Sequence, residues 1–373
     1  MNERRLRVLV VDDTVVYRRI VSEILASLPG VEVLSAAANG KIALQKMEQL
    51  HPDLLTLDLE MPEMDGLEVL RQLKAKNSPV GAIMLSAFTT SGADATVAAL
   101  KLGAFDFVLK PSGTDTDSNI EELRRELGHK IEAFARSRSL REAVGDSSGP
   151  QPVATRKASS ASEVVRRMSI IAQPASGKPE VVALGISTGG PQALSRMLPQ
   201  LPGDLAAPML IVQHMPPKFT ASLAHDLNSR CQLAVSEAAG DDAVVPGRIL
   251  IAPGGRQMKL DREGERLVVR VTEDPPENHC RPAVDYLFRS VAHVCGPNAV
   301  GVIMTGMGSD GALGCRLLKR RGATIITQDE ATCVVYGMPK QPTEEGLADA
   351  VVPLERMATE ITRLAGRGVP AWK

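Results

Sequence analysis

The sequence predicts an α/β protein made of two doubly wound, mainly parallel sheets that are joined by a linker. Short apolar runs alternate with helical patterns through residues 1–125, and the same alternation resumes at residue 180. The stretch between them lacks aromatic residues from 137 to 178 and is dominated by Ser, Ala, Pro and Gly. A length of 373 residues allows roughly two to three domains. We therefore expect a first domain over residues 1–125, a helix end and flexible linker over 126–179, and a second domain over 180–373.

The linker contains a more apolar island. Its members are Val164, Val165, Met168, Ile170 and Ile171. The island is either an irregular segment or a short stretch that docks on one of the domains, and the sequence gives the two interpretations equal weight.

The first domain contains five candidate strands with helical patterns between them. The strands are Arg7–Val11, Val31–Ala36, Leu54–Leu59, Val80–Ser86 and Ala104–Leu109. The helical patterns include Val15–Leu28, Gly40–Gln49 and Gly66–Lys76. Strands and helices that alternate at these lengths are typical of a parallel sheet with helices on both faces. Ligands of such sheets bind beyond the carboxyl ends of the strands, at the point where the strand order reverses.

Five polar residues stand at those carboxyl ends. Asp12 and Asp13 follow the first strand and Asp58 ends the third, and these strands are neighbours in the order 2-1-3-4-5. Carboxylates this close repel one another unless a cation lies among them, and oxygen ligands suit Mg²⁺. Ser86 and Lys110 end the next two strands. Singly, an aspartate here could cap the following helix, but the ordered set predicts a site for a phosphoryl group on a carboxylate.

The second domain opens with a strand, a glycine-rich turn and a helix. Val181–Ile186 is apolar, Ser187-Thr188-Gly189-Gly190 forms the turn, and Pro191 suits the first turn of a helix. The letters GISTG fit the G-x-S-x-G pattern that exposes a nucleophilic serine above free backbone amides. The motif alone is weak, because Ser187 could cap the helix or the amides could hold a nucleotide phosphate.

Two later strands supply possible partners for Ser187. Leu210–Gln213 ends at His214, and Val300–Thr305 is followed by a tight turn that contains Asp310. A serine needs an adjacent base to become a nucleophile, and the base needs an anion that fixes its tautomer. The order Ser–His–Asp differs from the Ser–Asp–His order of ordinary α/β-hydrolases. Either this is an unrelated fold with the same geometry, or the assignment is wrong.

Other histidines compete with His214 for the role of base. His225 fits a helix surface, and His293 fits the C-terminal turn of the expected helix Val284–Val294. His279 lies in the proline-rich loop PPENHCRP and is a real rival. We favour His214 because it stands at a strand end.

Composition excludes several function classes. Lys and Arg number 43 and Asp and Glu number 44, so the net charge of −1 argues against binding nucleic acid by bulk phosphate neutralisation. Only 3% of residues are aromatic, which disfavours base-stacking platforms. No apolar run is long enough for a membrane span, and Asp12 interrupts the N-terminal apolar run too early for a signal peptide. We expect a cytoplasmic protein.

The five cysteines show neither disulfide nor zinc spacing. Cys231, Cys280, Cys295, Cys315 and Cys333 are widely separated, and none forms a C-x-x-C pair. His279-Cys280 is the only adjacent pair of Cys and His. We therefore expect reduced thiols, most of them buried, and no zinc site.

The first domain resembles the receiver domain of two-component response regulators over its whole length. The matching stretches are LVVDD, DLLTLDLEMPEMDG, LSAFT and FVLKP. The resemblance implies a flavodoxin-like fold in which Asp58 accepts phosphate from a histidine kinase of the CheA type. It further implies that Asp12 and Asp13 hold Mg²⁺ together with Asp58, that Ser86 senses the phosphoryl oxygens and that Lys110 pairs with them.

One position departs from the usual receiver pattern. The aromatic residue three positions before Lys110 is Phe107, where tyrosine is commoner. The difference removes a hydroxyl that partners could use, and it leaves the phosphorylation chemistry unchanged.

The second domain closely resembles the CheB family of chemotaxis protein-glutamate methylesterases. The matching stretches are GISTGGPQAL, QHMPPKFTASLAHDLN, IAPGGRQMKL, RPAVDYLFRSVA, IMTGMGSDGA and VVYGMPK. The resemblance implies hydrolysis of glutamyl methyl esters on chemoreceptor cytoplasmic helices, with release of methanol, and deamidation of particular glutamines. It places the catalytic roles on Ser187, His214 and Asp310. No cofactor is expected for the esterase chemistry.

The resemblance also places the oxyanion contacts and a regulatory role. The amide of Met307, and the amides of Thr188 and Gly189 at the helix start, would hold the oxyanion. Ile186 stands where the family commonly has Ala, a departure that concerns packing. The unphosphorylated receiver would cover the esterase site.

Three other functions remain as alternatives. A phosphorylation-gated transcription factor would need a helix-turn-helix or a basic recognition face, which the second domain lacks. A pure adaptor would not need the three triad residues. A serine hydrolase with another substrate is excluded only by the long family motifs.

Overall fold

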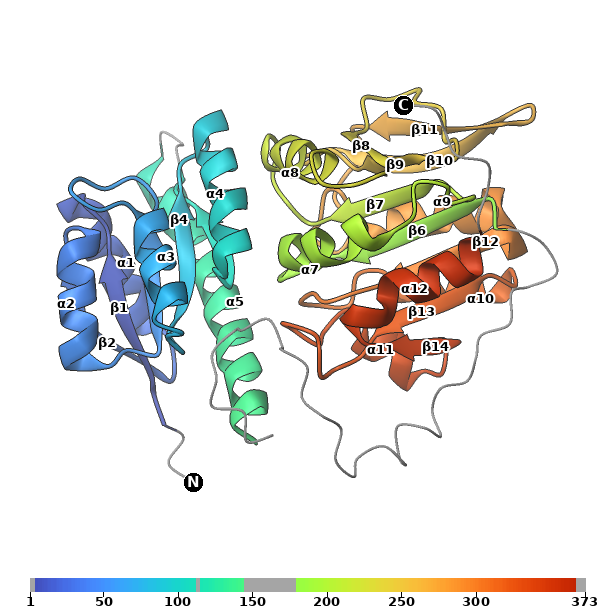
Figure 1. Ribbon diagram of the computed structural model, residues 1–373. Coiled ribbons are helices and arrows are strands. Elements are labelled where there is room, and N and C mark those ends of the chain that lie inside the picture. The colour runs from blue at the N-terminus through green and yellow to red at the C-terminus, as the bar shows by residue number, and fades with distance from the viewer. Residues whose placement is uncertain (1–3, 112–114, 144–178, 367–373) are drawn as a thin grey trace. The chain divides into compact units, whose positions relative to one another are not determined.

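The computed structural model describes residues 4–111, 115–143 and 179–366. The chain divides into two compact units, one N-terminal and one C-terminal (Figure 1). The apolar island of the linker lies outside the described residues, and the domain boundaries at 125/126 and 179/180 stay predictions. Helix α5 (Thr116–Ala143) continues past residue 125.

The N-terminal unit is a five-stranded parallel sheet in the order β2-β1-β3-β4-β5, as predicted. Its strands are β1 (Leu6–Val11), β2 (Val31–Ala37), β3 (Leu54–Asp58), β4 (Gly81–Ser86) and β5 (Asp106–Leu109). Its helices before α5 are α1 (Val15–Ser27), α2 (Gly40–Leu50), α3 (Gly66–Ala75) and α4 (Thr90–Leu102). Because β1 lies between β2 and β3, the strand order reverses there, and Asp12 and Asp58 end on neighbouring strands.

The C-terminal unit is built on a seven-stranded parallel sheet in the order β14-β13-β12-β6-β7-β9-β8. Its strands are β6 (Val181–Ile186), β7 (Met209–Gln213), β8 (Ala234–Glu237), β9 (Arg248–Ile251), β12 (Ala299–Ile303), β13 (Thr324–Gln328) and β14 (Ala350–Val352). Strands β10 (Gln257–Glu263) and β11 (Arg266–Thr272) form a separate antiparallel hairpin. The doubly wound, mainly parallel fold is confirmed, and the hairpin is its antiparallel part.

Helices cover both faces of the seven-stranded sheet (Figure 1). They are α7 (Gly190–Met197), α8 (Phe219–Asn228), α9 (Val284–Val294), α10 (Ala312–Arg320), α11 (Lys340–Glu344) and α12 (Leu354–Ala365), with 3-10 turns at Leu198–Gln200 and Gly296–Asn298. Helices α7 and α12 pack together on one face, and α9 and α10 pack together on the other.

The central strand β6 shows why the sheet forms as it does. All six residues of its sequence VVALGI are buried, as expected for a strand covered by helices on both faces. Its side chains join the apolar core that includes Phe288 of α9 and Ile303 of β12. Ile186, the departure from the family pattern, is fully buried in this strand. Strand β6 is thereby fixed between β12 and β7, whose carboxyl ends carry the other predicted site residues.

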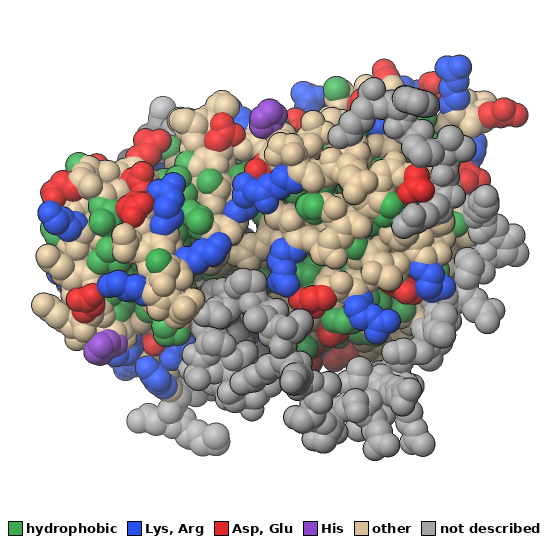
Figure 2. Space-filling model, viewed as in Figure 1, with side chains coloured by type: hydrophobic (Ala, Val, Ile, Leu, Met, Phe, Trp, Pro, Cys, Tyr) green, Lys and Arg blue, Asp and Glu red, His purple; other side chains and the backbone are tan. Residues whose placement is uncertain are grey.

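Charged side chains of both signs are interspersed on the face of each unit shown in Figure 2. This pattern agrees with the balanced composition of the whole chain. Among the residues that the structure describes, no helix combines the length and the apolar character that crossing a membrane requires.

Candidate functional sites

The first site is an acidic pocket at the carboxyl edge of the five-stranded sheet. Lys110 Nζ, just beyond β5, lies 2.7 Å from an Asp12 carboxylate oxygen and 2.6 Å from an Asp58 carboxylate oxygen. Asp12 is fully buried and Asp58 nearly so, whereas Asp13 is exposed. The ammonium group therefore bridges the two buried carboxylates from neighbouring strands.

Burial and mutual contact shift the pKa values of this pocket. Burial raises the pKa of Asp58, and the nearby charge of Asp12 adds to the rise, although Lys110 opposes it. Burial alone would lower the pKa of Lys110, but its contacts with Asp12 and Asp58 raise it overall. The three groups thus form one electrostatic unit in which a buried cation compensates buried carboxylates.

The pocket has the donor set of a magnesium site. Carboxylate oxygens of Asp12, Asp13 and Asp58 lie within 4.8 Å of one another. The hollow beside them measures about 260 Å³, and Asp13, Asp58 and Lys110 are among the residues that line it. Hard divalent cations prefer oxygen ligands, and Mg²⁺ usually keeps some of its waters. The residues present therefore fit Mg²⁺ and leave room for a phosphoryl group.

Ser86 lies at the end of β4 but is engaged elsewhere. Its buried hydroxyl oxygen accepts a hydrogen bond from the Thr96 hydroxyl over 2.8 Å and lies 3.3 Å from the carbonyl of Gly92, both on α4. Phe107 of β5 is buried. The structure thus brings Asp12, Asp58 and Lys110 into contact and places Ser86 one strand away, bonded to α4.

The second site begins with two residues that occupy matching positions on neighbouring strands. Ile186 and Gln213 are paired at the ends of β6 and β7, so Ser187 and His214 come next on each strand. The backbone continues the pairing, since the His214 N–H donates to the Ile186 carbonyl over 3.1 Å. Neighbouring strands are about 4.8 Å apart, so Ser187 and His214 stand side by side at the sheet edge.

Ser187 does not cap the helix that follows it. The N-cap of α7 is Gly189, whose positive φ of 79° suits glycine, and no side chain caps the helix. The Ser187 N–H donates instead to the carbonyl of Thr305, just beyond β12. The capping interpretation of this serine is therefore wrong, and its hydroxyl has no capping role.

His214 and Asp310 form a hydrogen-bonded pair. His214 Nε2 lies 2.8 Å from Asp310 Oδ2. Burial alone would lower the pKa of His214, but Asp310 and then Cys280 raise it overall. Burial alone would raise the pKa of Asp310, but the contact with His214 lowers it overall. Asp310 therefore stabilises positive charge on the imidazole ring, which a general base needs once it has taken a proton. Among the described contacts there is no hydrogen bond between Ser187 and His214.

Three further donors hold the Asp310 carboxylate. The N–H groups of Val284 and Asp285, at the start of α9, donate to it over 2.7 and 3.0 Å. The Asn278 side-chain amide donates over 2.9 Å. An ionised carboxylate with this many donors is fixed in place, and the positive end of a helix favours its charge.

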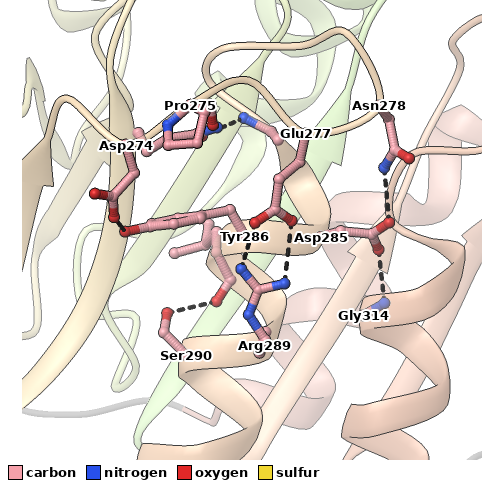
Figure 3. A network of polar contacts seen from close by, with 12 residues as sticks. Asp274, Pro275, Glu277, Asn278, Asp285, Tyr286, Arg289, Ser290 and Gly314 are labelled. Carbon is pink, nitrogen blue, oxygen red and sulfur yellow. Dashed lines mark hydrogen bonds and ion pairs between the residues drawn. The ribbon is translucent and has the colours of Figure 1, made fainter.

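The same asparagine also binds a second buried carboxylate (Figure 3). Asn278 Nδ2 donates to Asp285 Oδ2 over 2.9 Å, and the Gly314 N–H donates to the other oxygen over 2.6 Å. Burial raises the pKa of Asp285, and the charge of Asp310 raises it further. Asn278 therefore lies between two carboxyl groups whose pKa values are shifted in opposite directions.

The loop that carries Asn278 is anchored to α9 at two further points (Figure 3). Arg289 binds Glu277 through both ends of its guanidinium group. The Tyr286 hydroxyl donates to the carboxylate of Asp274. Two-pronged arginine–carboxylate contacts fix geometry well. Asn278 belongs to no sequence motif and was not predicted, although the same loop was singled out for His279.

Two backbone N–H groups remain available near Ser187. Within the described chain, the N–H groups of Gly189 and Met307 donate no hydrogen bond. Gly189 is the N-cap residue of α7, and Met307 is half-buried in the turn after β12. Thr188 is buried, and its carbonyl accepts from the Thr305 hydroxyl. The two N–H groups fit the contacts that an oxyanion beside the serine needs.

The rival histidine stands apart from this arrangement. His279 is exposed and has a positive φ of 61° in the loop before α9. The next residue does approach the site, because Cys280 Sγ lies 3.8 Å from His214 Nδ1. The structure therefore pairs His214, not His279, with Asp310.

The fold and the two sites define a class of protein in which one α/β unit carries an acidic pocket of the response-regulator type. The other α/β unit carries a serine, a histidine and an aspartate at its sheet edge. Residues 8–119 match the family model of the response regulator receiver domain, and residues 182–361 match that of the CheB methylesterase. The chain belongs to the CheB methylesterase family, and it is an ester hydrolase with a receiver domain.

Similar proteins match along the whole chain. The protein-glutamate methylesterase/protein-glutamine glutaminase of Desulfotalea psychrophila is 48% identical, over 96% of this chain and 98% of that protein. The protein-glutamate methylesterase/protein-glutamine glutaminase 5 of Anaeromyxobacter dehalogenans is 45% identical, over 97% of each. The crystal structure of the Thermotoga maritima CheB methylesterase catalytic domain is 40% identical and covers 50% of this chain and 100% of that chain, with a TM-score of 0.49.

Proposed function

We propose that this protein hydrolyses glutamyl methyl esters on the cytoplasmic helices of chemoreceptors, releasing methanol, and deamidates particular receptor glutamines. The names of relatives that match over the full chain support this substrate class. The observation that carries the proposal is the hydrogen bond between His214 and Asp310 at the strand end next to Ser187. The reaction adapts chemotaxis-type signalling, and we place it in the cytoplasm.

The geometry supports an acyl-enzyme mechanism. Because His214 Nε2 is bound to Asp310, the lone pair on Nδ1 is the one that accepts the Ser187 proton as the hydroxyl attacks the ester carbonyl. Asp310 orients the ring and stabilises its positive charge. The proton then passes from His214 to the departing methoxide, and water hydrolyses the acyl-enzyme. Catalytic hydrogen bonds are often long before substrate binds, which accommodates the open Ser187–His214 pair.

The backbone N–H groups of Gly189 and Met307 hold the oxyanion in this mechanism, with Thr188 shaping the same turn. Both groups are fixed by the sheet and the helix start, so they need little reorganisation during the reaction. The amide of a glutamine passes through an analogous tetrahedral intermediate that loses ammonia instead of methanol, so one site serves esterase and deamidase chemistry.

Methanol release from methylated receptor fragments tests the proposal. We expect Ser187→Ala and His214→Ala to lose nearly all esterase activity, since loss of a triad member costs roughly 10⁴ in rate. Asp310→Asn should keep a small residual activity. His279→Ala serves as the matched histidine control and stays within a few-fold of wild type. Near-normal turnover in Ser187→Ala would refute the nucleophile, and a larger loss in His279→Ala than in His214→Ala would move the base.

For the N-terminal unit, we propose that Asp58 accepts a phosphoryl group from a histidine kinase of the CheA type. Asp12, Asp13 and Asp58 would hold Mg²⁺, which neutralises charge on the phosphoryl oxygens when it is bound. Lys110 pairs with those oxygens, and Ser86 leaves its contact with Thr96 to reach them. We expect labelling by a small phosphodonor to require Mg²⁺ and to vanish in Asp58→Asn. Labelling that survives this substitution would identify another acceptor.

We further propose that the unphosphorylated receiver inhibits the esterase site. A tethered domain has a high effective concentration, so even a weak contact is well populated. Phosphorylation of Asp58 replaces its single negative charge with a phosphoryl group that carries about two, and it draws Ser86 away from α4, which biases the receiver surface. We expect phosphodonor and Mg²⁺ to raise the esterase rate of the wild-type chain and to leave that of Asp58→Asn unchanged. Equal rates with and without donor would show that the receiver does not gate the site.

A further inference from the structure

Cys280 stands beside the nitrogen of His214 that does not contact Asp310. Its Sγ atom lies 3.8 Å from His214 Nδ1, while Nε2 is held by the carboxylate 2.8 Å away. Cys280 is half-buried, and the His214 side chain is 14% exposed. Ligand atoms of His214, Cys280 and Asp310 all lie within 4.8 Å of one another. The pair is therefore sheltered but open to small ions.

This arrangement has the chemistry of a metal-binding pair. A histidine that binds a metal usually donates its other ring N–H to a carboxylate, as His214 does to Asp310. That bond places the lone pair on Nδ1, which faces the thiol. Sulfur and nitrogen ligands of a tetrahedral Zn²⁺ stand about 3.6 Å apart, given bonds of about 2.3 and 2.0–2.1 Å. The observed 3.8 Å needs only a small adjustment.

The loop keeps Cys280 in this place. Glu277 and Cys280 exchange two backbone hydrogen bonds, of 3.1 and 2.7 Å, that close a tight turn. Glu277 is in turn bound by Arg289 of α9 (Figure 3). The thiol is thus presented by an anchored turn, and a preformed pair of ligands loses little conformational freedom on binding.

We propose that His214 Nδ1 and Cys280 Sγ form a binding site for Zn²⁺, and that an ion bound there blocks ester hydrolysis. Thiolate and imidazole ligands suit Zn²⁺, and water completes the coordination. Binding releases the thiol proton to solvent and involves no oxidation or reduction. The block rests on the proposed function, because the ion occupies the lone pair that would accept the Ser187 proton. Asp310 stays outside the coordination sphere and orients the ring.

Cysteine spacing in the sequence predicts no zinc site, and this pair of ligands could not be found from spacing. His214 and Cys280 are separated by 66 positions in the chain, so no sequence motif joins them. Only the fold, which carries the loop before α9 to the end of β7, brings the two ligands together. In this proposal the bound ion only inhibits the enzyme, and ester hydrolysis itself requires no metal.

The test uses the full chain with excess Mg²⁺, which occupies the acidic pocket of the receiver. Co²⁺ is titrated while its thiolate charge-transfer absorption is recorded, and Zn²⁺ is then added to displace it. Methanol release is measured over the same Zn²⁺ range, each variant relative to its own metal-free rate. The variants are Cys280→Ser, Cys280→His and Ser187→Ala, with Cys333→Ser as the matched control at another half-buried cysteine.

We expect the wild type and Cys333→Ser to show the absorption band and to be inhibited by Zn²⁺. Cys280→Ser should lose the band and need about tenfold or more Zn²⁺ for half-inhibition. Cys280→His should lose the band but remain sensitive, because it restores a nitrogen ligand. Absence of band and inhibition in the wild type, or unchanged sensitivity in Cys280→Ser, would overturn the proposal. Ser187→Ala separates the two ideas: it should bind Co²⁺ like the wild type whether or not Ser187 is the nucleophile.

Discussion

Gly306 lies directly against Ser187. A Cβ atom at position 306 would stand 2.8 Å from the Ser187 Cβ and 2.3 Å from the sulfur of Met338. Met338 is fully buried, so it has little room to move aside. The backbone of the turn after β12 therefore comes as close to the serine as a residue without a side chain allows.

We expect Gly306→Ala to lower kcat for methanol release by about 10- to 100-fold, because the added methyl group displaces Ser187 from its partners, and small misplacements are costly in catalysis. The matched control is Gly128→Ala, where the nearest atom to the new methyl group would be 3.6 Å away. Circular dichroism checks that both variants fold. An unchanged kcat in a folded Gly306→Ala would show that the close approach does not position the serine.

Asn278 lies between the carboxyl groups of Asp310 and Asp285. We therefore expect kcat to fall when its amide is removed, and to fall further when a negative charge replaces the amide. Asn278→Ala removes one donor to Asp310 and should lower kcat about tenfold, by roughly the value of one charge-assisted hydrogen bond. Asn278→Asp keeps the shape but adds a third carboxyl group, so it should be slower still.

The control for this series is Asn298→Ala, since Asn298 binds Glu180 away from the site. Methanol release measured for the three variants decides the matter. If Asn278→Asp equalled the wild type, the role of Asn278 would be one of shape alone.

The site residues at the carboxyl ends of strands could be predicted from the sequence, because polar side chains directly follow apolar runs there. Asp12 follows β1, Asp58 ends β3, and Ser187 and His214 follow β6 and β7. These are the positions where parallel sheets bind ligands, and buried apolar runs mark the four strands clearly. Asp310 could be predicted from the sequence for the same reason, since it lies in the glycine-rich turn that follows β12.

The loop before α9 was not predictable in this way. Asn278 and His279 both have positive φ, a conformation that single-sequence patterns do not indicate for non-glycine residues. That backbone sends Asn278 toward Asp310 and leaves His279 in solvent. The contact between Cys280 and His214 depends on the same path, and the hairpin β10–β11 also escaped the sequence analysis.

Lys110 compensates two buried carboxylates, so its removal should destabilise the receiver when magnesium is absent. We expect Lys110→Ala to lower the local unfolding free energy by about 3 kcal/mol in EDTA, because it leaves buried charge unpaired. Mg²⁺ should restore more stability to this variant than to the wild type.

Hydrogen exchange of receiver peptides, measured by mass spectrometry, provides these free energies. Lys76→Ala is the control: its pair with Glu48 is exposed and should contribute less than about 1 kcal/mol. Equal losses in the two variants would contradict a special role for the buried ammonium group.

The cysteines should differ sharply in reactivity toward iodoacetamide at neutral pH. Burial, reinforced by Glu180, raises the pKa of Cys295 to about 12, and burial also raises the pKa values of Cys315 and Cys333. Since the thiolate is the reactive form, these three should resist labelling. Cys280 is half-buried beside a base and should label first.

Peptide mapping by mass spectrometry follows the labelling, and esterase activity is measured at each time point. We expect activity to fall in step with modification of Cys280, because an added group beside His214 blocks the site. Cys280→Ser should keep its activity throughout the treatment. Inactivation that instead follows Cys333 would contradict this assignment.

Strand β6 pairs on one side with β7, which follows it closely in the chain, and on the other with β12, in a register that matches Val181 with Ala299. Contacts between such distant segments form late and slow the folding of a domain. A chain still emerging from the ribosome can therefore set Ser187 beside His214 long before Asp310 and Met307 have been synthesised. If the four residues act as we propose, a nascent or truncated chain that ends before β12 carries the serine and the histidine but should not hydrolyse esters.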